Sequence, residues 1–327
     1  MSKNERASAS PAKKKTAMSL EDFFANELPP LSEIVTFCNT LPMSLYADTT
    51  GVKSPEVVYR GLMLSQNRLV AEEYLLNSRR SEADLGVVIG TNNYTLPMAV
   101  GAVVKRDLEE DESDHLPLPP YQNLKDPLGA VIRSRRSKRH YSGKAISRQE
   151  LSTILFHANG VTGHLHLAQP RETVGLGKMA HQELRANISG GALYPIDLFV
   201  LPLRVEGLEA RPYRYLPREH ALKPVGPAGP LPEISRLAQF GEIQAERSAF
   251  LLGYVYNVFE NARKYGEAGL GFAFIEVGAI AAQLHLAVTS LGLAACDVGS
   301  FSKPRFENLF EADGVSRHMI HLTVVGR

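Results

Sequence analysis

The sequence contains no tryptophan and only two cysteines, Cys38 and Cys296, in 327 residues. Two cysteines so far apart give no basis for a disulfide framework, so we expect a protein of the reducing cytoplasm. No apolar run reaches the roughly 18–20 residues that a membrane-spanning helix needs, and we expect no membrane partner. Residues 1–15 are polar, contain three consecutive lysines and have no apolar core, so they do not resemble a secretory signal.

Charge of one sign is also not in excess. The formal net charge is +1, from 36 basic and 35 acidic residues. The sequence therefore has no bulk charge that would attract nucleic acid, and we expect no nucleic-acid partner. Hydrophobic residues at 44% and charged residues at 22% are ordinary for a globular protein. The length allows one large domain or two.

The composition divides the chain into three parts. Residues 1–17 are rich in serine, alanine and lysine, and we expect a disordered tail. Residues 18–115 carry apolar residues at helical spacing between 56 and 79, and they end in an acidic run with prolines after it. This pattern predicts an N-terminal helical region followed by an acidic, proline-rich linker. Residues 116–327 then form the main domain.

Helical and strand patterns alternate within the main domain, which is typical of an α+β fold. The sequence Ser147-x-x-Glu150 is a capping box that opens an apolar helix, and Asn159-Gly160 is the expected end of that helix. The expected helices cover residues 128–134, 151–158 and 272–291, and the expected strands cover 196–203, 213–216, 250–256, 296–301 and 319–325.

The region between the helix expected at 151–158 and the strand expected at 196–203 has no regular apolar pattern. His164 and His166 have no carboxylate or cysteine at ligand spacing nearby, so we expect a pair of loop histidines and no metal site. Residues 172–185 are expected to form a mobile loop over the functional site.

A cluster of cations follows the first expected helix of the main domain. Arg135, Arg136, Ser137 and Arg139 place three guanidiniums and a hydroxyl within five positions. Arginine forks match phosphate oxygens bidentately, so this cluster can hold a phosphate dianion. On charge alone, a solvated basic face at the end of a helix explains the cluster equally well.

Two further motifs are weak when each is taken alone. Paired glycines at Gly190 and Gly191 let backbone amides approach a flat ring, because no Cβ is in the way. Without context, a plain turn before a strand explains them better. Lys264 and Tyr265 precede a glycine and can serve where a proton must be removed, although a surface Lys-Tyr pair is common and usually has no function.

Taken together, the motifs resemble those of the nitroreductase superfamily, which binds FMN. The order Arg-Arg-Ser-x-Arg-x-aromatic is similar to its phosphate-binding motif. The glycine-rich segment resembles the Ser-Gly-Gly-Ala-x-Tyr-Pro block of one branch, the thiazole/oxazole-forming (SagB-type) dehydrogenases, and simple nitroreductases tend to have Asn where Ala192 stands. The resemblance covers roughly residues 120–327. It implies a nitroreductase-like FMN-binding fold, with a central mixed β-sheet flanked by helices and an N-terminal helical extension.

The resemblance also implies which residues form the site. Gly299 and Ser300 stand where the family has Gly-Gly before Phe, and their backbone amides are implied to face the N5 edge of the flavin. Arg327 either adds charge to the phosphate site or is a solvated terminus. The implied catalytic residues are Lys264 and Tyr265, and the implied cofactor-binding residues are Arg135, Arg136, Ser137, Arg139, Ser189, Gly190, Gly191, Gly299, Ser300 and Arg327.

The long helix expected at 272–291 continues the resemblance but departs from it at two positions. Its one Asp, Glu, Lys or Arg residue is Glu276, so we expect it to be buried on most of its faces. The family often has His where Ala279 stands and Asn where Leu284 stands. These departures leave the core helix intact and bear on the peptide contacts near it.

The implied activity is an FMN-dependent dehydrogenation of thiazoline or oxazoline rings to azoles in a ribosomally made precursor peptide, as in antibiotic biosynthesis. The implied partners are this peptide, the cyclodehydratase subunits of a synthetase complex, and a second copy of the chain in a homodimer that builds two FMN sites across its interface. Two alternatives remain open: an NAD(P)H-dependent nitroreductase or quinone reductase, and a non-catalytic subunit of a peptide-modifying complex.

Overall fold

A computed structural model describes Tyr74 and residues 114–166, 181–226, 231–238 and 240–327. The tail expected at 1–17 lies outside these residues. The N-terminal region and linker expected at 18–115 also lie outside them, apart from Tyr74 and the last two residues.

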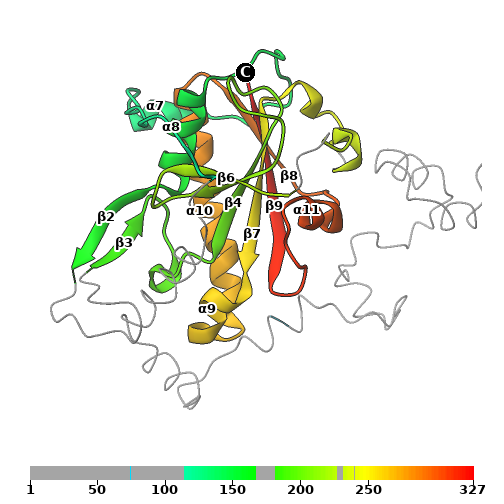
Figure 1. Ribbon diagram of the computed structural model, residues 1–327. Coiled ribbons are helices and arrows are strands. Elements are labelled where there is room, and N and C mark those ends of the chain that lie inside the picture. The colour runs from blue at the N-terminus through cyan, green and yellow to red at the C-terminus, as the bar shows by residue number, and fades with distance from the viewer. Residues whose placement is uncertain (1–73, 75–113, 167–180, 227–230, 239) are drawn as a thin grey trace, which may run out of the picture.

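The described chain is built on a seven-stranded sheet (Figure 1). Its strands lie in the order β1-β6-β5-β4-β7-β9-β8, and every pair of neighbours is antiparallel. The parallel component of the expected mixed sheet is a single bridge between Ile146 and Val205. The strands are β1 (Leu116–Pro117), β4 (Ile196–Pro202), β5 (Tyr213–Leu216), β6 (Ala221–Pro224), β7 (Phe250–Asn257), β8 (Ala294–Val298) and β9 (Arg317–Gly326).

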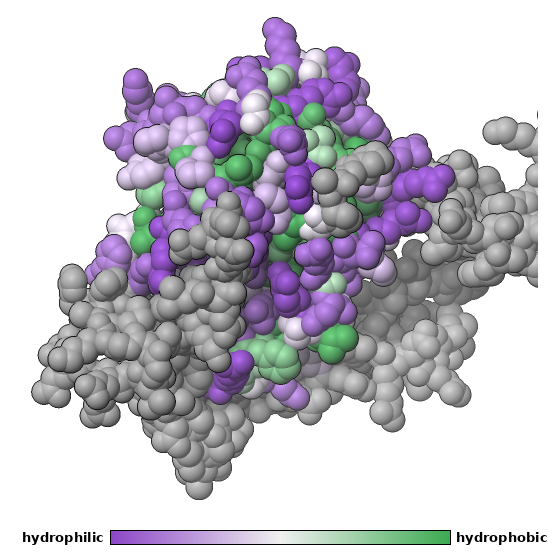
Figure 2. Space-filling view, viewed as in Figure 1, coloured by the Kyte–Doolittle hydropathy of each residue, from purple (hydrophilic) through white to green (hydrophobic). Residues whose placement is uncertain are grey.

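Every residue of β4 is buried, because both faces of the sheet are covered. Side chains alternate between the two faces of a strand, so Leu198 and Val200 lie in one hydrophobic core while Phe199 and Leu201 lie in the other. For this reason β4 reads in the sequence as a continuous apolar run. By contrast, the outer surface seen in Figure 2 is mainly hydrophilic, with hydrophobic residues in small groups.

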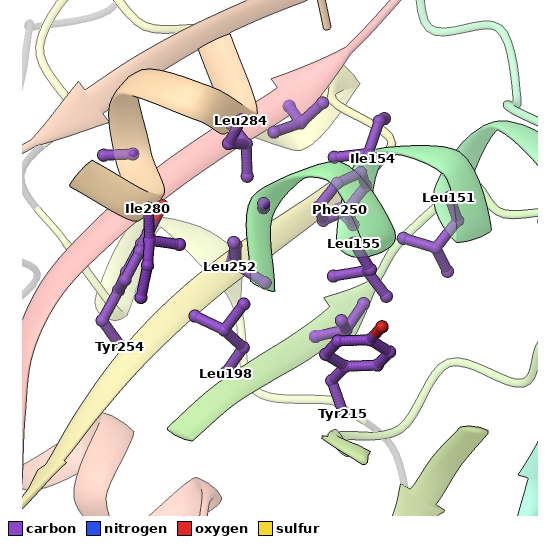
Figure 3. Close-up of a cluster of buried hydrophobic side chains, with 14 of the residues drawn as sticks. Leu151, Ile154, Leu155, Leu198, Tyr215, Phe250, Leu252, Tyr254, Ile280 and Leu284 are labelled. Carbon is purple, nitrogen blue, oxygen red and sulfur yellow. The ribbon is translucent and has the colours of Figure 1, made fainter. Parts of the chain in front are cut away.

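Helices cover one face of the sheet. Leu155 of α8 and Ile280 and Leu284 of α10 lie in one core with Leu252 and Tyr254 of β7 (Figure 3). The helices on this side of the molecule are α7 (Leu128–Ser134), α8 (Arg148–Asn159), α9 (Val258–Tyr265) and α10 (Ala268–Ser290).

The capping box predicted before α8 is present. The Ser147 hydroxyl accepts a hydrogen bond from the Glu150 amide at 3.1 Å, and the Glu150 carboxylate accepts one from the Ser147 amide at 2.8 Å. The helix ends at Asn159, and Gly160 follows as the C-cap, as predicted. A reciprocal pair of bonds satisfies two backbone donors that the first turn leaves without helical partners.

The second core lies on the opposite face, under α11 (Lys303–Leu309). Phe310, directly after α11, stacks on Phe199 of β4 with ring centroids 4.8 Å apart. The sequence did not predict α11, α9 or β6. Three short 3-10 turns complete the described elements, at Gly190–Ala192, Ile234–Arg236 and Ala245–Arg247.

The prediction of a loop over residues 172–185 is wrong in its last part. β2 (Val161–His166) pairs with β3 (His181–Arg185) as a separate antiparallel ribbon. His164 is therefore in a strand and not in a loop. These strands carry no apolar alternation, and their pairing rests on backbone hydrogen bonds, so the periodicity of the sequence could not indicate them.

The prediction for the long apolar helix is only partly confirmed. α10 begins four residues earlier than expected, and Phe274 and Ile275 are 53% and 60% exposed, so one of its faces is open. By length and composition α10 is also apolar enough to cross a membrane. Half of that segment is buried inside the protein, as is usual for a core helix.

Candidate active site

The glycine-rich loop and the Lys-Tyr pair meet in space. Lys264 and Tyr265 are the last two residues of α9, which ends at Gly266. A Cβ atom added to Gly191 would lie 2.6 Å from the Tyr265 hydroxyl oxygen and 2.9 Å from Lys264 Nζ. These distances are too short for a carbon substituent, and Gly191 also has a φ of +64°. The backbone conformation therefore favours glycine here, and any larger residue would also have to displace the ends of the Tyr265 and Lys264 side chains.

The aromatic ring of Phe272 supports both parts of this cluster. The rings of Tyr265 and Phe272 meet edge to face with centroids 4.9 Å apart. A Cβ at Gly190 would stand 3.4 Å from the Phe272 ring, which is ordinary contact. Lys264 Nζ lies 5.3 Å from the centroid of the Tyr265 ring, within reach of a cation–π attraction.

Several hydrogen bonds hold the glycine-rich loop in place. The Ser189 hydroxyl accepts a bond from the Tyr194 amide at 2.9 Å, so this predicted flavin contact also shapes its own loop. The Tyr194 hydroxyl accepts a bond from the Arg185 amide at 2.9 Å, and burial raises the pKa of that hydroxyl. Gln283 of α10 donates to the Ala186 carbonyl at 2.6 Å. The loop is thereby attached to α10 and to the end of β3.

We expect Gly191→Ala to disturb the Lys264–Tyr265 pair. The new methyl group overlaps the tyrosine hydroxyl, and an alanine with positive φ adds about 1 kcal/mol of backbone strain. Thermal unfolding should show a loss of about 1–3 kcal/mol, as for other overpacked sites. Gly190→Ala is the matched control, because its methyl group makes only ordinary contact with Phe272. Equal stability of the two variants would contradict the packing described above.

The predicted phosphate-binding residues form a loop across the ends of β8 and β9. The Lys138 amide donates to the Ala295 carbonyl at 2.9 Å, and the buried Tyr141 hydroxyl donates to the Val324 carbonyl at 3.2 Å. Burial raises the pKa of Tyr141 well above its usual range. The side chains of Ser137, just before the first anchor, and of Arg139, between the two anchors, are exposed.

The arginines of this loop differ in their surroundings. Arg136 is exposed, and its guanidinium donates to the carbonyls of Arg133 and Arg135 at 2.9 and 2.7 Å. Arg135 is half-buried and lines a groove. The guanidinium of Arg327 bonds instead to Glu150 and lines a separate polar pocket. The structure thus does not bring the Arg327 side chain to the groove that Arg135 lines.

We name this groove the Arg135 groove. It has a volume of about 610 Å³ and lies between α10 and the β8–β9 edge of the sheet. Its α10 wall includes small residues, Gly278, Ala281 and Ala282, which leave room for a flat ligand. An apolar cleft of this size with a few polar groups is typical of a cofactor site, and Arg135 supplies a phosphate donor. The residues present therefore fit FMN.

A cluster that the sequence did not predict also lines the groove. Asp297 of β8 accepts hydrogen bonds from His285 Nε2 at 3.0 Å, His321 Nε2 at 3.2 Å and Thr323 Oγ1 at 2.6 Å. Asp297 and Thr323 are register partners on β8 and β9, and His321 lies two residues before Thr323 on the same side of β9. Asp297, His285 and the β9 pair of His321 and Thr323 are far apart in the sequence, so no local motif could have indicated the cluster.

The remaining predicted residues, Gly299 and Ser300, are exposed and follow β8 directly. A second pocket of about 810 Å³ lies beside Gly266 at the end of α9. It shares Phe274 and Ile320 with the Arg135 groove, so the two are neighbours along α10. Among the described residues, no group of three or more His, Cys, Asp or Glu is arranged to hold a metal ion.

The Lys264–Tyr265 pair and the Arg135 groove lie on different faces of α10. Phe272 contacts Tyr265, whereas Phe274 lines the groove. Two residues of an α-helix are separated by about 200° around its axis. The residues predicted to move a proton and the arginine predicted to bind phosphate thus lie on different sides of one helix.

Comparison with known proteins gives a family match. Residues 132–327 match the Nitroreductase family. A nitroreductase-like protein of Methanocaldococcus jannaschii is 28% identical over 210 residues, which are 64% of this chain and 94% of that protein. A nitroreductase-like structure from Ralstonia eutropha is 21% identical with a TM-score of 0.48, over 67% of this chain and 91% of the other. The E. coli microcin synthetase McbBCD complex contains a chain that is 19% identical with a TM-score of 0.45, over 87% of this chain and 97% of that one.

Proposed function

Because the chain belongs to the nitroreductase family and is an FMN-dependent oxidoreductase, we propose that it oxidises thiazoline or oxazoline rings to azoles in a ribosomally made peptide. It would act in the cytoplasm on a precursor that the cyclodehydratase subunits of a synthetase complex have already cyclised. Membership of the family shows that the protein is an oxidoreductase. The ring oxidation is the finer step and rests on the residues described below.

The contact between Gly191 and the Lys264–Tyr265 pair carries this proposal. Each motif alone has a trivial explanation, but the two resemble neighbouring blocks of the same branch of peptide dehydrogenases. Their contact supports a common role, because Gly191 has no room for a side chain beside the tyrosine hydroxyl and the lysine amine. A turn that served only to reverse the chain would have no need of that contact.

Separate groups of residues in the chain would bind the cofactor and take up the proton. Arg135, Arg136, Ser137 and Arg139 would hold the FMN phosphate, and the backbone of Gly299 and Ser300 would face the flavin ring. The flavin supplies a hydride acceptor when it is bound. Conversion of an azoline to an azole removes a hydride from one ring carbon and a proton from the neighbouring ring carbon.

Lys264 and Tyr265 would take up the proton. Both side chains are half-buried at the end of α9, and the Tyr265 ring is held by Phe272. A base held at a fixed position contributes to the rate because it needs no reorganisation when the proton leaves.

A homodimer would bring together the groups that lie on opposite sides of α10. One copy presents the Lys264–Tyr265 pair and the Arg135 groove on different sides of the helix, so we propose that a second copy completes each site. The exposed side chains of Phe274 and Ile275 support an interface along this helix, because large apolar residues rarely stay solvated when they are grouped.

Ile275→Glu should dissociate the proposed dimer. Burying a carboxylate without a partner costs at least about 1–3 kcal/mol, so the dimer should weaken about 5- to 150-fold. Sedimentation velocity at several concentrations measures this change. Val315→Glu is the matched control, because Val315 is 79% exposed and lies in a loop away from α10. A wild-type protein that is monomeric and still holds FMN would refute the shared site.

The function is tested on the purified protein with a heterocyclised peptide. We expect a yellow protein with the absorption spectrum of FMN, and mass spectrometry should show the loss of two hydrogens for each azole formed. Bleaching of the flavin by NADPH without peptide oxidation would favour the reductase alternative. A colourless protein that FMN does not restore would favour the non-catalytic subunit.

A further inference from the structure

We propose that Asp297 places a fixed negative charge beside the bound flavin and thereby weakens the binding of reduced FMN relative to oxidised FMN. His285 and His321 hold the carboxylate in position. This inference rests on the proposed function, because it takes the Arg135 groove as the flavin site.

Asp297 lies in the groove that would hold the flavin. Its side chain lines the same groove as Arg135, the half-buried arginine of the phosphate motif. Asp297 also stands two residues before Gly299, the first residue after β8, so the groove that Asp297 lines and the Gly299 backbone lie at the same end of this strand. Val298, between them, is buried in the core on the other side. A ligand that reaches from Arg135 to the backbone of Gly299 would therefore pass the Asp297 carboxylate.

The charge of Asp297 is the second step. Burial opposes ionisation, but hydrogen bonds from His285, His321 and Thr323 outweigh it and hold the pKa of the carboxyl well below its usual range. The aspartate is thus an anion at neutral pH. Its side chain remains 39% exposed toward the groove, so its field reaches a ligand there.

The groups around the carboxylate determine its net effect. His285 is buried, His321 is 25% exposed, and Arg135 is the remaining cation of the groove. Tyr254 of β7 lies beside His321 and Thr323, and Cys296 precedes Asp297 on β8; burial raises the pKa values of both, so they stay neutral. The variants are therefore compared at one fixed pH, so that these surrounding groups contribute equally to each measurement.

The electrostatic consequence follows from the chemistry of the ligand. Two-electron reduction of a flavin with uptake of one proton leaves it with an additional negative charge. A fixed carboxylate opposes that charge, and the opposition is stronger near a protein surface than between the same charges in bulk water. Oxidised FMN has a neutral ring, so its binding should depend little on Asp297.

Asp297→Asn tests this inference. The change keeps the shape and an acceptor oxygen but removes the charge. At pH 8.5, reduced FMN should bind about tenfold more tightly relative to oxidised FMN than in the wild type. This ratio corresponds to a midpoint potential that is about 30 mV higher for the two-electron couple. Equilibration with a reference dye measures the potential, and titration with FMN measures the affinity of the oxidised form.

Two matched variants separate charge from structure. Thr323→Val removes one hydrogen bond to the carboxylate and keeps the charge, so it should retain the wild-type potential. Asp297→Glu also keeps the charge and should retain it. If Asp297→Asn binds FMN at the wild-type potential, the inference is wrong while the proposed function stands. If the wild type binds no FMN, the proposed function itself fails.

His321→Gln provides a second test that does not depend on the folding of Asp297→Asn. His321→Gln removes a partly exposed imidazole next to an intact carboxylate. The midpoint potential should then stay unchanged or fall, because no negative charge is lost and any positive charge on the imidazole is removed. A rise in potential for His321→Gln would contradict the proposed role of Asp297.

Discussion

Replacing Lys264 with alanine should lower the rate of peptide oxidation about 10²- to 10⁴-fold, the usual contribution of general acid–base catalysis. The flavin should remain bound, because this lysine lies against Gly191 and Tyr265 on one face of α10 while the Arg135 groove lies on another. The rate is measured by mass spectrometry as loss of two hydrogens per ring, and flavin content by absorbance.

Tyr265→Phe should also lower the rate of peptide oxidation. The ring and its edge contact with Phe272 are retained, so the change removes only the hydroxyl that stands beside Gly191. Arg263→Ala is the matched control, since Arg263 is an exposed cation one residue earlier on α9. If Lys264→Ala keeps FMN and oxidises peptide at the wild-type rate, the pair is structural and the reductase alternative gains support.

The double variant Arg135→Ala and Arg139→Ala should lose most of its flavin. A hydrogen bond to a charged group contributes about 1.5–3 kcal/mol, so the loss of two weakens FMN binding by about two to four decades. Arg135 lines the groove directly and Arg139 extends from the exposed part of the same loop. Quenching of FMN fluorescence on titration measures the dissociation constant.

The control for this experiment removes two other cations near the same loop. Lys125 and Arg133 are exposed and lie outside the phosphate motif, so Lys125→Ala with Arg133→Ala should retain FMN. The comparison separates specific phosphate contacts from the general positive charge of this surface. Full flavin occupancy in the Arg135 and Arg139 double variant would overturn the assignment of the phosphate site.

Local signals in the sequence predicted the elements that depend on few residues. The capping box at Ser147 and Glu150 marks the start of α8, and α7 has the bounds expected from its pattern. The strands at 196–203 and 250–256 were predicted to within one residue at either end, because continuous burial leaves a continuous apolar run. β8 was expected at 296–301, but it ends at Val298, where the chain leaves the sheet.

Elements without an apolar pattern could not be predicted in this way. β2 and β3 pair through their backbones, and the polar sequence of His181–Arg185 indicated a loop. The open face of α10 was also missed, because uniform hydrophobicity shows that a helix is apolar without showing which face is covered.

The sequence alone determined the family resemblance and the fold class, and it supplied the prediction of which residues bind phosphate or move a proton. These properties depend on residue types at short spacing, which a chain carries whether or not it is folded. The tertiary structure decided which residues meet. It brings Gly191 against Lys264 and Tyr265, and it joins Asp297 to His285 and His321 through the register of β8 and β9. Such contacts join residues far apart in the chain, so only folding brings them together.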